Sequence, residues 1–301
     1  MSAPDSLKSI LFAFFANLSI AIAKGFAALF TGSGAMLAET IHSLADSGNQ
    51  LLLILGLRQT RHPPTDEHPL GFGKSIYFWS FLVALILFSL GGMFSLYEGV
   101  HKLTHPTPLS YPWVAIGVLA FAIVAESVSM WGCMREVNKE RRGRSLMRWF
   151  RESRTSALIV VFGEDIAALA GLVLALLAVV ATYVTGNPMW DALGTVTIGL
   201  LLIVIAVFIA IEIKGLLIGQ SVDPELLAEM RQYLVDQPQV EAIYNLLTLQ
   251  FGPDVVAAVK ARMAPQASDQ ALVEAINTTE AGFRTRFPSI RWLFFEPDNR
   301  D

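Results

Sequence analysis

Cysteine and charged residues are both scarce in this chain. Cys133 is the only cysteine, which excludes an intrachain disulfide and a zinc site built from several thiolates. Only 16% of the residues are charged, whereas 53% are hydrophobic, which departs from the composition of ordinary soluble domains. The composition therefore excludes a typical soluble protein and indicates a chain that crosses a membrane several times.

Six apolar runs account for this composition. Each has about the 20 residues that an α-helix needs to cross a hydrocarbon layer roughly 30 Å thick. The first run is too long for a removable signal peptide and lacks the small-residue cleavage pattern, so we expect it to be a retained span. The runs lie near residues 9–30, 35–57, 76–99, 113–134, 155–184 and 190–213.

The distribution of basic residues predicts how the spans are oriented. The connections after the first and fifth spans, TGSG and TGNP, contain no Lys or Arg, whereas the connection between the fourth and fifth spans is rich in both. By the positive-inside rule the basic connection is cytoplasmic, which places both termini in the cytoplasm. Its basic residues are Arg135, Lys139, Arg141, Arg142, Arg144, Arg148, Arg151 and Arg154.

The last part of the chain is water-compatible and locally acidic, with 12 acidic and 7 basic residues from position 221 onward. Capping signals at Asp223 and Ser268 predict two helices, and alternating apolar runs predict three strands. We expect a membrane domain at 1–219 and a cytoplasmic domain with the order αββαβ at 220–301. This tail contains no His or Cys, which argues against a metal-sensing cluster and favours a dimerisation role.

Polar residues cluster inside two of the apolar runs. The second run contains Glu39, His42 and Asp46, followed by Asn49, at spacings of three, four and three residues that put all four on one helical face. The fifth run contains the adjacent pair Glu164 and Asp165. Because charges within spans are costly, they usually face a partner or a wet cavity and mark a transport pathway.

A metal ion is one physical reason for this clustering. His42 and Asp46 lie one helical turn apart and can bind one divalent cation from the same side, while a carboxylate such as Asp165 from a facing helix completes the site. Glu164 is a further candidate ligand, although adjacent residues point about 100° apart on a helix. Glu39 lies nearer the outer end and is either a ligand or a gate carboxylate.

Each of these residues also has a simpler interpretation. A histidine within a span is often only a hydrogen-bond partner for a neighbouring helix. Lys24 in the first span is most simply a counter-charge for the acidic cluster, and Glu126 in the fourth span could pair with it. Asn17 and Asn49 are candidates for orienting the ligands through hydrogen bonds.

These residues resemble the cation diffusion facilitator family. The similarity rests on the six runs, the His42-x-x-x-Asp46 motif, the HPLGFGK segment before the third run and the soluble αββαβ tail, and it covers essentially the whole chain. The longer strings HPLGFGKSIYFWSF, FSLGGMFSLYEG and FGEDIAALAGL resemble the branch of human zinc transporter nine and its bacterial relatives. The resemblance implies an α-helical membrane protein with six transmembrane helices and a small cytoplasmic ferredoxin-like domain.

The chain departs from the family pattern at two places. Alignment of Asp165 and Gly171 with the family's fifth span leaves Val161 where a His or Asp usually stands, so Glu164 is a candidate for the missing fourth ligand. The tail lacks the histidines of the family's cytoplasmic metal sites, and Phe72 stands where a loop histidine would lie. Only the intramembrane site is carried over, with His42, Asp46, Asp165, Glu164 and Glu39 as its candidate metal residues.

The resemblance implies a secondary active transporter, not an enzyme. It implies a homodimer in a lipid bilayer, in a bacterial inner membrane, whose protomers export a divalent cation by alternating access in exchange for protons. Zinc is the first expectation, and manganese, or iron or cobalt, is the alternative. No prosthetic group and no nucleic acid are expected. Two readings from other classes are an intramembrane metalloenzyme built on His42, Asp46 and Asp165, and a metal-responsive scaffold that signals through its tail.

Overall fold

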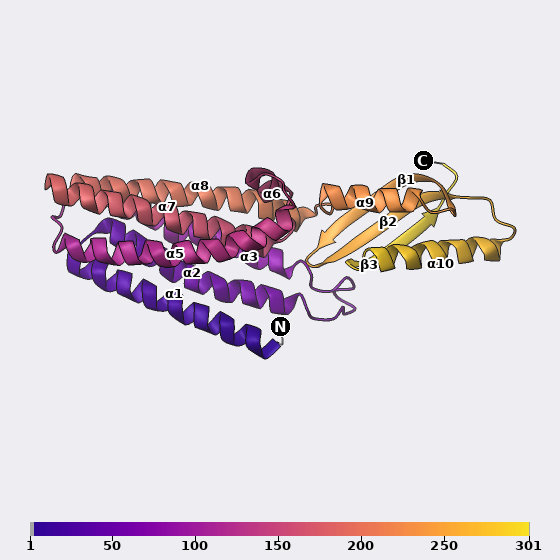
Figure 1. Ribbon diagram of the computed structural model, residues 1–301, viewed down its shortest axis with the longest axis horizontal. Coiled ribbons are helices and arrows are strands. Elements are labelled where there is room, and N and C mark those ends of the chain that lie inside the picture. The colour runs from indigo at the N-terminus through magenta and orange to yellow at the C-terminus, as the bar shows by residue number, and fades with distance from the viewer. Residues whose placement is uncertain (1–2, 301) are drawn as a thin grey trace. The chain divides into compact units, whose positions relative to one another are not determined.

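Long α-helices, drawn with their axes roughly aligned, form most of the protein (Figure 1). The computed structural model describes residues 3–300, and their side chains from residue 17 onward. Each apolar run of the sequence falls within a long helix. These helices are α1 (Ala3–Thr31), α2 (Gly34–Gln59), α3 (Ser75–Ile86) continued by η1 (Leu87–Met93) and α4 (Phe94–Thr104), α5 (Pro112–Arg141), α7 (Ser156–Thr185) and α8 (Met189–Ile218).

Four of the described helical segments are long and apolar enough to cross a membrane, namely Ser75–Thr104, Pro112–Arg141, Ser156–Thr185 and Met189–Ile218. The described side chains of α1 form a shorter apolar segment, Asn17–Thr31. In α2, polar residues interrupt the apolar pattern. The predicted total of six transmembrane helices therefore stays a prediction for α1 and α2.

Contacts divide the chain into two compact units, which are described separately. The first contains most of the long helices, and the second contains the C-terminal region together with residues 57–78 and 145–156. Residues 145–156 include a short helix, α6 (Leu146–Glu152), within the basic connection. Its first turn is capped by Ser145, whose hydroxyl oxygen accepts a hydrogen bond from the Arg148 N–H at 3.3 Å.

Glycines bring the third long segment and α8 into backbone contact within the first unit. A Cβ atom added at Gly199 would lie 2.6 Å from the Leu96 nitrogen, and one added at Gly99 would lie 2.6 Å from the Val196 nitrogen. Membrane helices gain little from hydrophobic burial against one another, so close van der Waals packing at small residues is a main source of their association. These glycines therefore hold α4 against α8.

A buried carboxylate at the start of α8 fixes the start of α2. Asp191 accepts hydrogen bonds from the Gly34 N–H at 2.7 Å and from the Ser33 hydroxyl, and its carboxylate lies 3.1 Å from Nζ of Lys102 in α4. A carboxylate is favourable here because the unpaired N–H groups and the dipole make a helix N-terminus positive. The helix that contains Glu39, His42 and Asp46 is thereby anchored to α4 and α8.

The C-terminal region has the predicted order αββαβ. Asp223 caps the first helix through the Glu225 N–H at 2.9 Å, and Ser268 caps the second through the Ala271 N–H at 3.2 Å, so both predicted caps are confirmed. The elements are α9 (Pro224–Val235), β1 (Val240–Phe251), β2 (Asp254–Met263), α10 (Asp269–Arg286) and β3 (Ile290–Pro297). The sheet order is β1-β2-β3, with β1 antiparallel and β3 parallel to β2.

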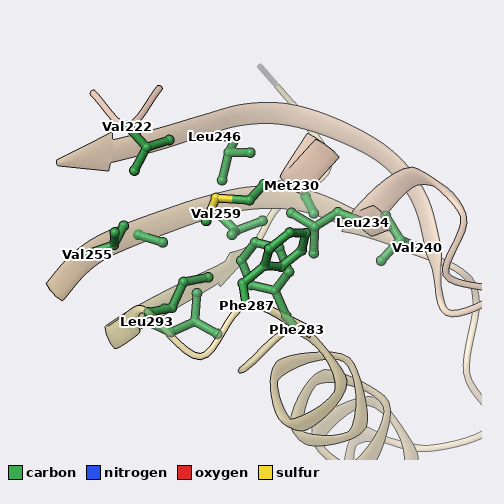
Figure 2. Packing of buried hydrophobic residues seen from close by; sticks show 13 residues of the cluster. Val222, Met230, Leu234, Val240, Leu246, Val255, Val259, Phe283, Phe287 and Leu293 are labelled. Atoms are coloured by element: carbon green, nitrogen blue, oxygen red, sulfur yellow. The ribbon is translucent and has the colours of Figure 1, made fainter. Parts of the chain in front are cut away.

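One face of this sheet supports a compact apolar core (Figure 2). Met230 and Leu234 of α9, together with Phe283 of α10 and Phe287 directly after it, pack on the inward side chains of the strands. The parallel pairing of β2 and β3 requires a crossover, and α10 provides it. Both α9 and α10 pack on this core face, and the opposite face of the sheet includes Leu247, Ala258 and Phe294, which share one cross-strand row.

Replacement of Gly199 by Val should disrupt the membrane bundle. The added side chain would collide with the backbone of the third long segment. Such overpacking typically lowers the free energy of unfolding by about 1–3 kcal/mol. We expect a lower thermal unfolding temperature for Gly199→Val in detergent. Gly117→Val in α5 is the matched control because a Cβ atom there meets nothing within 4 Å. Equal unfolding temperatures for the two variants would contradict the packing described here.

Candidate metal-binding site

A polar cavity of about 60 Å³ lies within the first unit, between α1, α2, α5 and α7. It is unusual in a membrane-crossing bundle because eight of its eleven lining residues have acidic, amide or hydroxyl side chains. The lining residues are Asn17, Ile20, Ser43, Asp46, Gln50, Glu126, Ser129, Val161, Glu164, Asp165 and Ala168.

Both adjacent acidic residues of α7 line this cavity, although they point in different directions. Asn49 of α2 donates a hydrogen bond of 2.6 Å to Glu164 Oε1. Ser129 of α5 donates one of 3.4 Å to Asp165 Oδ1. Asp165 is only 9% exposed, and its Oδ2 atom has no hydrogen-bond partner among the described residues. Through these hydrogen bonds α2 positions the Glu164 carboxylate and α5 positions the Asp165 carboxylate at the cavity.

The predicted histidine and aspartate of α2 lie in contact, but only the aspartate reaches the cavity. His42 Nε2 lies 3.5 Å from Asp46 Oδ2. The imidazole of His42 is fully buried, and neither ring nitrogen has a hydrogen-bond partner among the described residues. A Cβ atom added at Gly91, in the π-helical segment η1, would lie 4.0 Å from His42 Nδ1. The sequence indicates no π-helical turn there, and such turns are frequent at functional sites.

Glu39 has a different partner from the other candidate ligands. Nζ of Lys24 lies 3.3 Å from Glu39 Oε2 and donates a hydrogen bond of 2.7 Å to the Ser43 hydroxyl. Lys24 and Glu39 are both fully buried. The structure thus pairs Lys24 with Glu39 rather than with Glu126, the other candidate partner. Because Ser43 also lines the cavity, the ammonium group lies one side chain away from it.

The structure brings together some of the predicted ligands but not all of them. Asp46, Glu164 and Asp165 share the cavity, His42 contacts it only through Asp46, and Glu39 is held by Lys24. Among the residues with described side chains, no group of three or more His, Cys, Asp or Glu is arranged to hold a metal ion. The ligand set named from the sequence therefore stays a prediction.

Several cavity residues were not assigned to the site from the sequence. Glu126 and Ser129 of α5 line the cavity, as do Ser43 and Gln50 of α2. Their spacing contained a usable signal, because residues three apart on a helix share a face, and this applies to Glu126 with Ser129. Hydroxyl and amide residues are too common within membrane helices for that signal to select them without a structure.

The fold and the cavity define the class of the protein. A bundle of long apolar helices that encloses acidic side chains is typical of an integral membrane protein with a polar cavity between its helices. Residues 10–218 match the family model described as the cation efflux transmembrane domain. That match covers more than half of the chain, so the protein belongs to the cation efflux family.

Individual relatives agree with this assignment. The chain is 33% identical over 231 residues to a human protein named as a mitochondrial proton-coupled zinc antiporter, which is 76% of this chain and 41% of that protein. It is 34% identical over 226 residues to the protein of the same name in Xenopus laevis, or 74% of this chain and 40% of that protein. It is also 27% identical over 260 residues to the magnetosome protein MamB of Paramagnetospirillum magneticum, or 85% of this chain and 81% of that protein.

The buried pair of Lys24 and Glu39 gives a test of whether Glu39 binds the ion. Glu39→Gln alone would leave a buried ammonium unpaired, which typically costs about 3–5 kcal/mol, whereas Lys24→Met with Glu39→Gln removes both charges. If Glu39 serves only Lys24, the double variant should recover the thermal stability and the metal binding that Glu39→Gln loses. Calorimetric titration with Zn²⁺ in detergent measures the binding. Recovered stability without recovered binding would instead identify Glu39 as a ligand.

Proposed function

We propose that this protein exports a divalent cation, with zinc as the first candidate, in exchange for protons. One observation supports this above all: Asp46, Glu164 and Asp165 line a single cavity inside a bundle of membrane-crossing helices. Carboxylates in such a place are costly unless a positive charge joins them. A metal ion or protons can supply that charge, and exchange between the two is the proposed transport cycle.

The chemistry of the candidate ligands accounts for the coupling to protons. A carboxylate or an imidazole must lose its proton before it can bind a metal ion, and it regains a proton when the ion leaves. Metal ion and protons therefore compete for one site. Alternating access converts this competition into exchange, because the site opens to one side of the membrane at a time. His42 and Asp46, which already lie in contact, are the proposed centre of the exchange.

Zinc is proposed over manganese for two reasons. One imidazole nitrogen with two or three carboxylate oxygens is a suitable shell for Zn²⁺, although an oxygen-rich shell also accommodates Mn²⁺, Fe²⁺ or Co²⁺. The human and Xenopus laevis relatives are named as zinc antiporters. The chain spans about two fifths of the length of those relatives, so their substrate supports this proposal by analogy.

We infer a transporter rather than the metalloenzyme or the metal-responsive scaffold considered from the sequence. The matching family model describes a cation efflux domain, and that domain includes α2 and α7, which contribute the carboxylates. In this proposal residues 1–219 form a six-helix transport domain and residues 220–301 a cytoplasmic domain. Both termini are cytoplasmic because the basic connection between α5 and α7 faces inward, and the proposed location is a bacterial inner membrane.

We further propose that the protein is a homodimer that associates in part through its C-terminal sheet. On the sheet face opposite the core, Leu247 is 56% exposed and Phe294 58% exposed, and the strand pairing aligns both with Ala258. An apolar row on an otherwise water-compatible module is typical of an interaction surface. A second copy of the same face can cover it, because a two-fold interface uses one self-complementary patch.

Flux measurements on the wild type and on ligand variants test the transport proposal. We expect proteoliposomes with an acidic lumen to accumulate Zn²⁺ and to lose this activity when the proton gradient is collapsed. Asp46→Asn and Asp165→Asn should lower the rate by about tenfold or more, as losses around metal sites typically do. Glu274→Gln, at an exposed site on α10, should transport normally. Zn²⁺ uptake that is indifferent to the proton gradient would refute the antiport mechanism.

The dimer surface has its own test. Leu247→Asp with Phe294→Asp places like charges where the two copies would meet, so the dimer fraction of full-length protein in nanodiscs at nanomolar concentration should fall. Val273→Asp is the control, because Val273 lies on α10 and is similarly exposed, at 55%. An unchanged dimer fraction in the double variant would place the interface elsewhere.

A further inference from the structure

Glu126 in α5 lines the cavity but is not one of the candidate ligands named from the sequence. It lines the same space as Asp46, Glu164 and Asp165. Ser129, three residues further along α5, also lines the cavity and donates a hydrogen bond to Asp165 Oδ1 at 3.4 Å. Since residues three apart share a helical face, α5 presents its polar face to the carboxylates of α7.

The carboxylate of Glu126 has no hydrogen-bond or ion-pair partner among the side chains that the structure describes, residues 17–300. The nearby basic residue Lys24 is engaged by Glu39 and Ser43. Glu164, in contrast, accepts a hydrogen bond from Asn49. An acidic side chain in a membrane-crossing helix normally faces a partner or a pathway, so a positive charge in the cavity, either a metal ion or a proton, would stabilise Glu126.

A second observation indicates that this charge is a cation in the cavity. The Oδ2 atom of Asp165 is buried without a hydrogen-bond partner among the described residues, and so is the Oδ1 atom of Asp46. Both residues line the cavity together with Glu126. Three helices, α2, α5 and α7, thus each place at least one carboxylate along one cavity, and carboxylate oxygens are ligands that divalent cations accept.

We propose that Glu126 is a direct carboxylate ligand of the transported divalent cation and the contribution of α5 to its binding site. This inference rests on the proposed function and extends it to a third helix. It also explains why position 161 of α7 can be an apolar Val rather than a metal ligand. Val161 lines the same cavity and lies three and four residues before Glu164 and Asp165 on α7, so a carboxylate there would reach the same space. With Glu126 in place, α7 needs no third ligand.

The decisive comparison is between Glu126→Gln and the double variant Glu126→Gln with Val161→Asp, in the full-length protein. We expect Glu126→Gln to weaken Zn²⁺ binding, measured by calorimetric titration in detergent, by about tenfold or more. The double variant returns a carboxylate to the cavity from its α7 wall and should restore the affinity to near that of the wild type. Zn²⁺ uptake by proteoliposomes should follow the same order.

Glu98→Gln is the matched control, because Glu98 is a partly buried acidic residue of α4 outside the cavity lining. The Glu98→Gln variant should bind Zn²⁺ with the affinity of the wild type. Should Glu126→Gln fail to accumulate in membranes, Glu126→Asp retracts the carboxylate by one methylene and must also lower the affinity. Wild-type affinity in Glu126→Gln overturns the inference, and so does an affinity loss that Val161→Asp leaves uncorrected. Failure of the proposed function is a separate result, in which the wild type binds Zn²⁺ but produces no flux.

Discussion

The requirement that buried carboxylates be neutralised governs this membrane domain. The protein meets it in two ways. Glu39 has a permanent partner, the ammonium group of Lys24 at 3.3 Å. Asp46, Glu126 and Asp165 line a cavity, and Asp46 Oδ1 and Asp165 Oδ2 have no hydrogen-bond partner among the described residues. Because an unpaired charge is expensive away from water, an exchangeable positive charge would stabilise these residues, and this is the physical basis of the proposed cation exchange.

The rest of the bundle controls where that cavity lies. Asp191 holds the first turn of α2 to α4 and α8, and Gly99 and Gly199 let the backbones of α4 and α8 touch. The π-helical turn of η1 brings Gly91 close to the ring of His42. The helix with the predicted His-x-x-x-Asp motif is therefore anchored at its start and closely packed at its centre. Transport requires such a helix to move as a unit between discrete arrangements.

The C-terminal region, residues 220–300, has a water-compatible surface composition and an apolar core of its own. Its helices and sheet bury a compact apolar core around Phe283 and Phe287. At its far end Lys260 forms a hydrogen bond that lowers the pKa of the Asp298 carboxyl below its usual value. Residues 221–301 contain no His and no Cys. Its exposed apolar sheet face supports the proposed association between copies.

The sequence alone determined the local features: one long helical segment for each apolar run, the order αββαβ with its caps at Asp223 and Ser268, and the placement of Glu39, His42 and Asn49 on one face of α2. Hydrophobic periodicity and helix capping depend on residues that are close in the sequence, so both can be recognised without a tertiary structure. Only the tertiary structure decided that Lys24 pairs with Glu39, that Glu164 and Asp165 both reach one cavity, and that Glu126 joins them. These outcomes depend on how each helix is rotated and how deep it lies against its neighbours, and in a membrane those variables are set by packing between helices rather than by hydropathy.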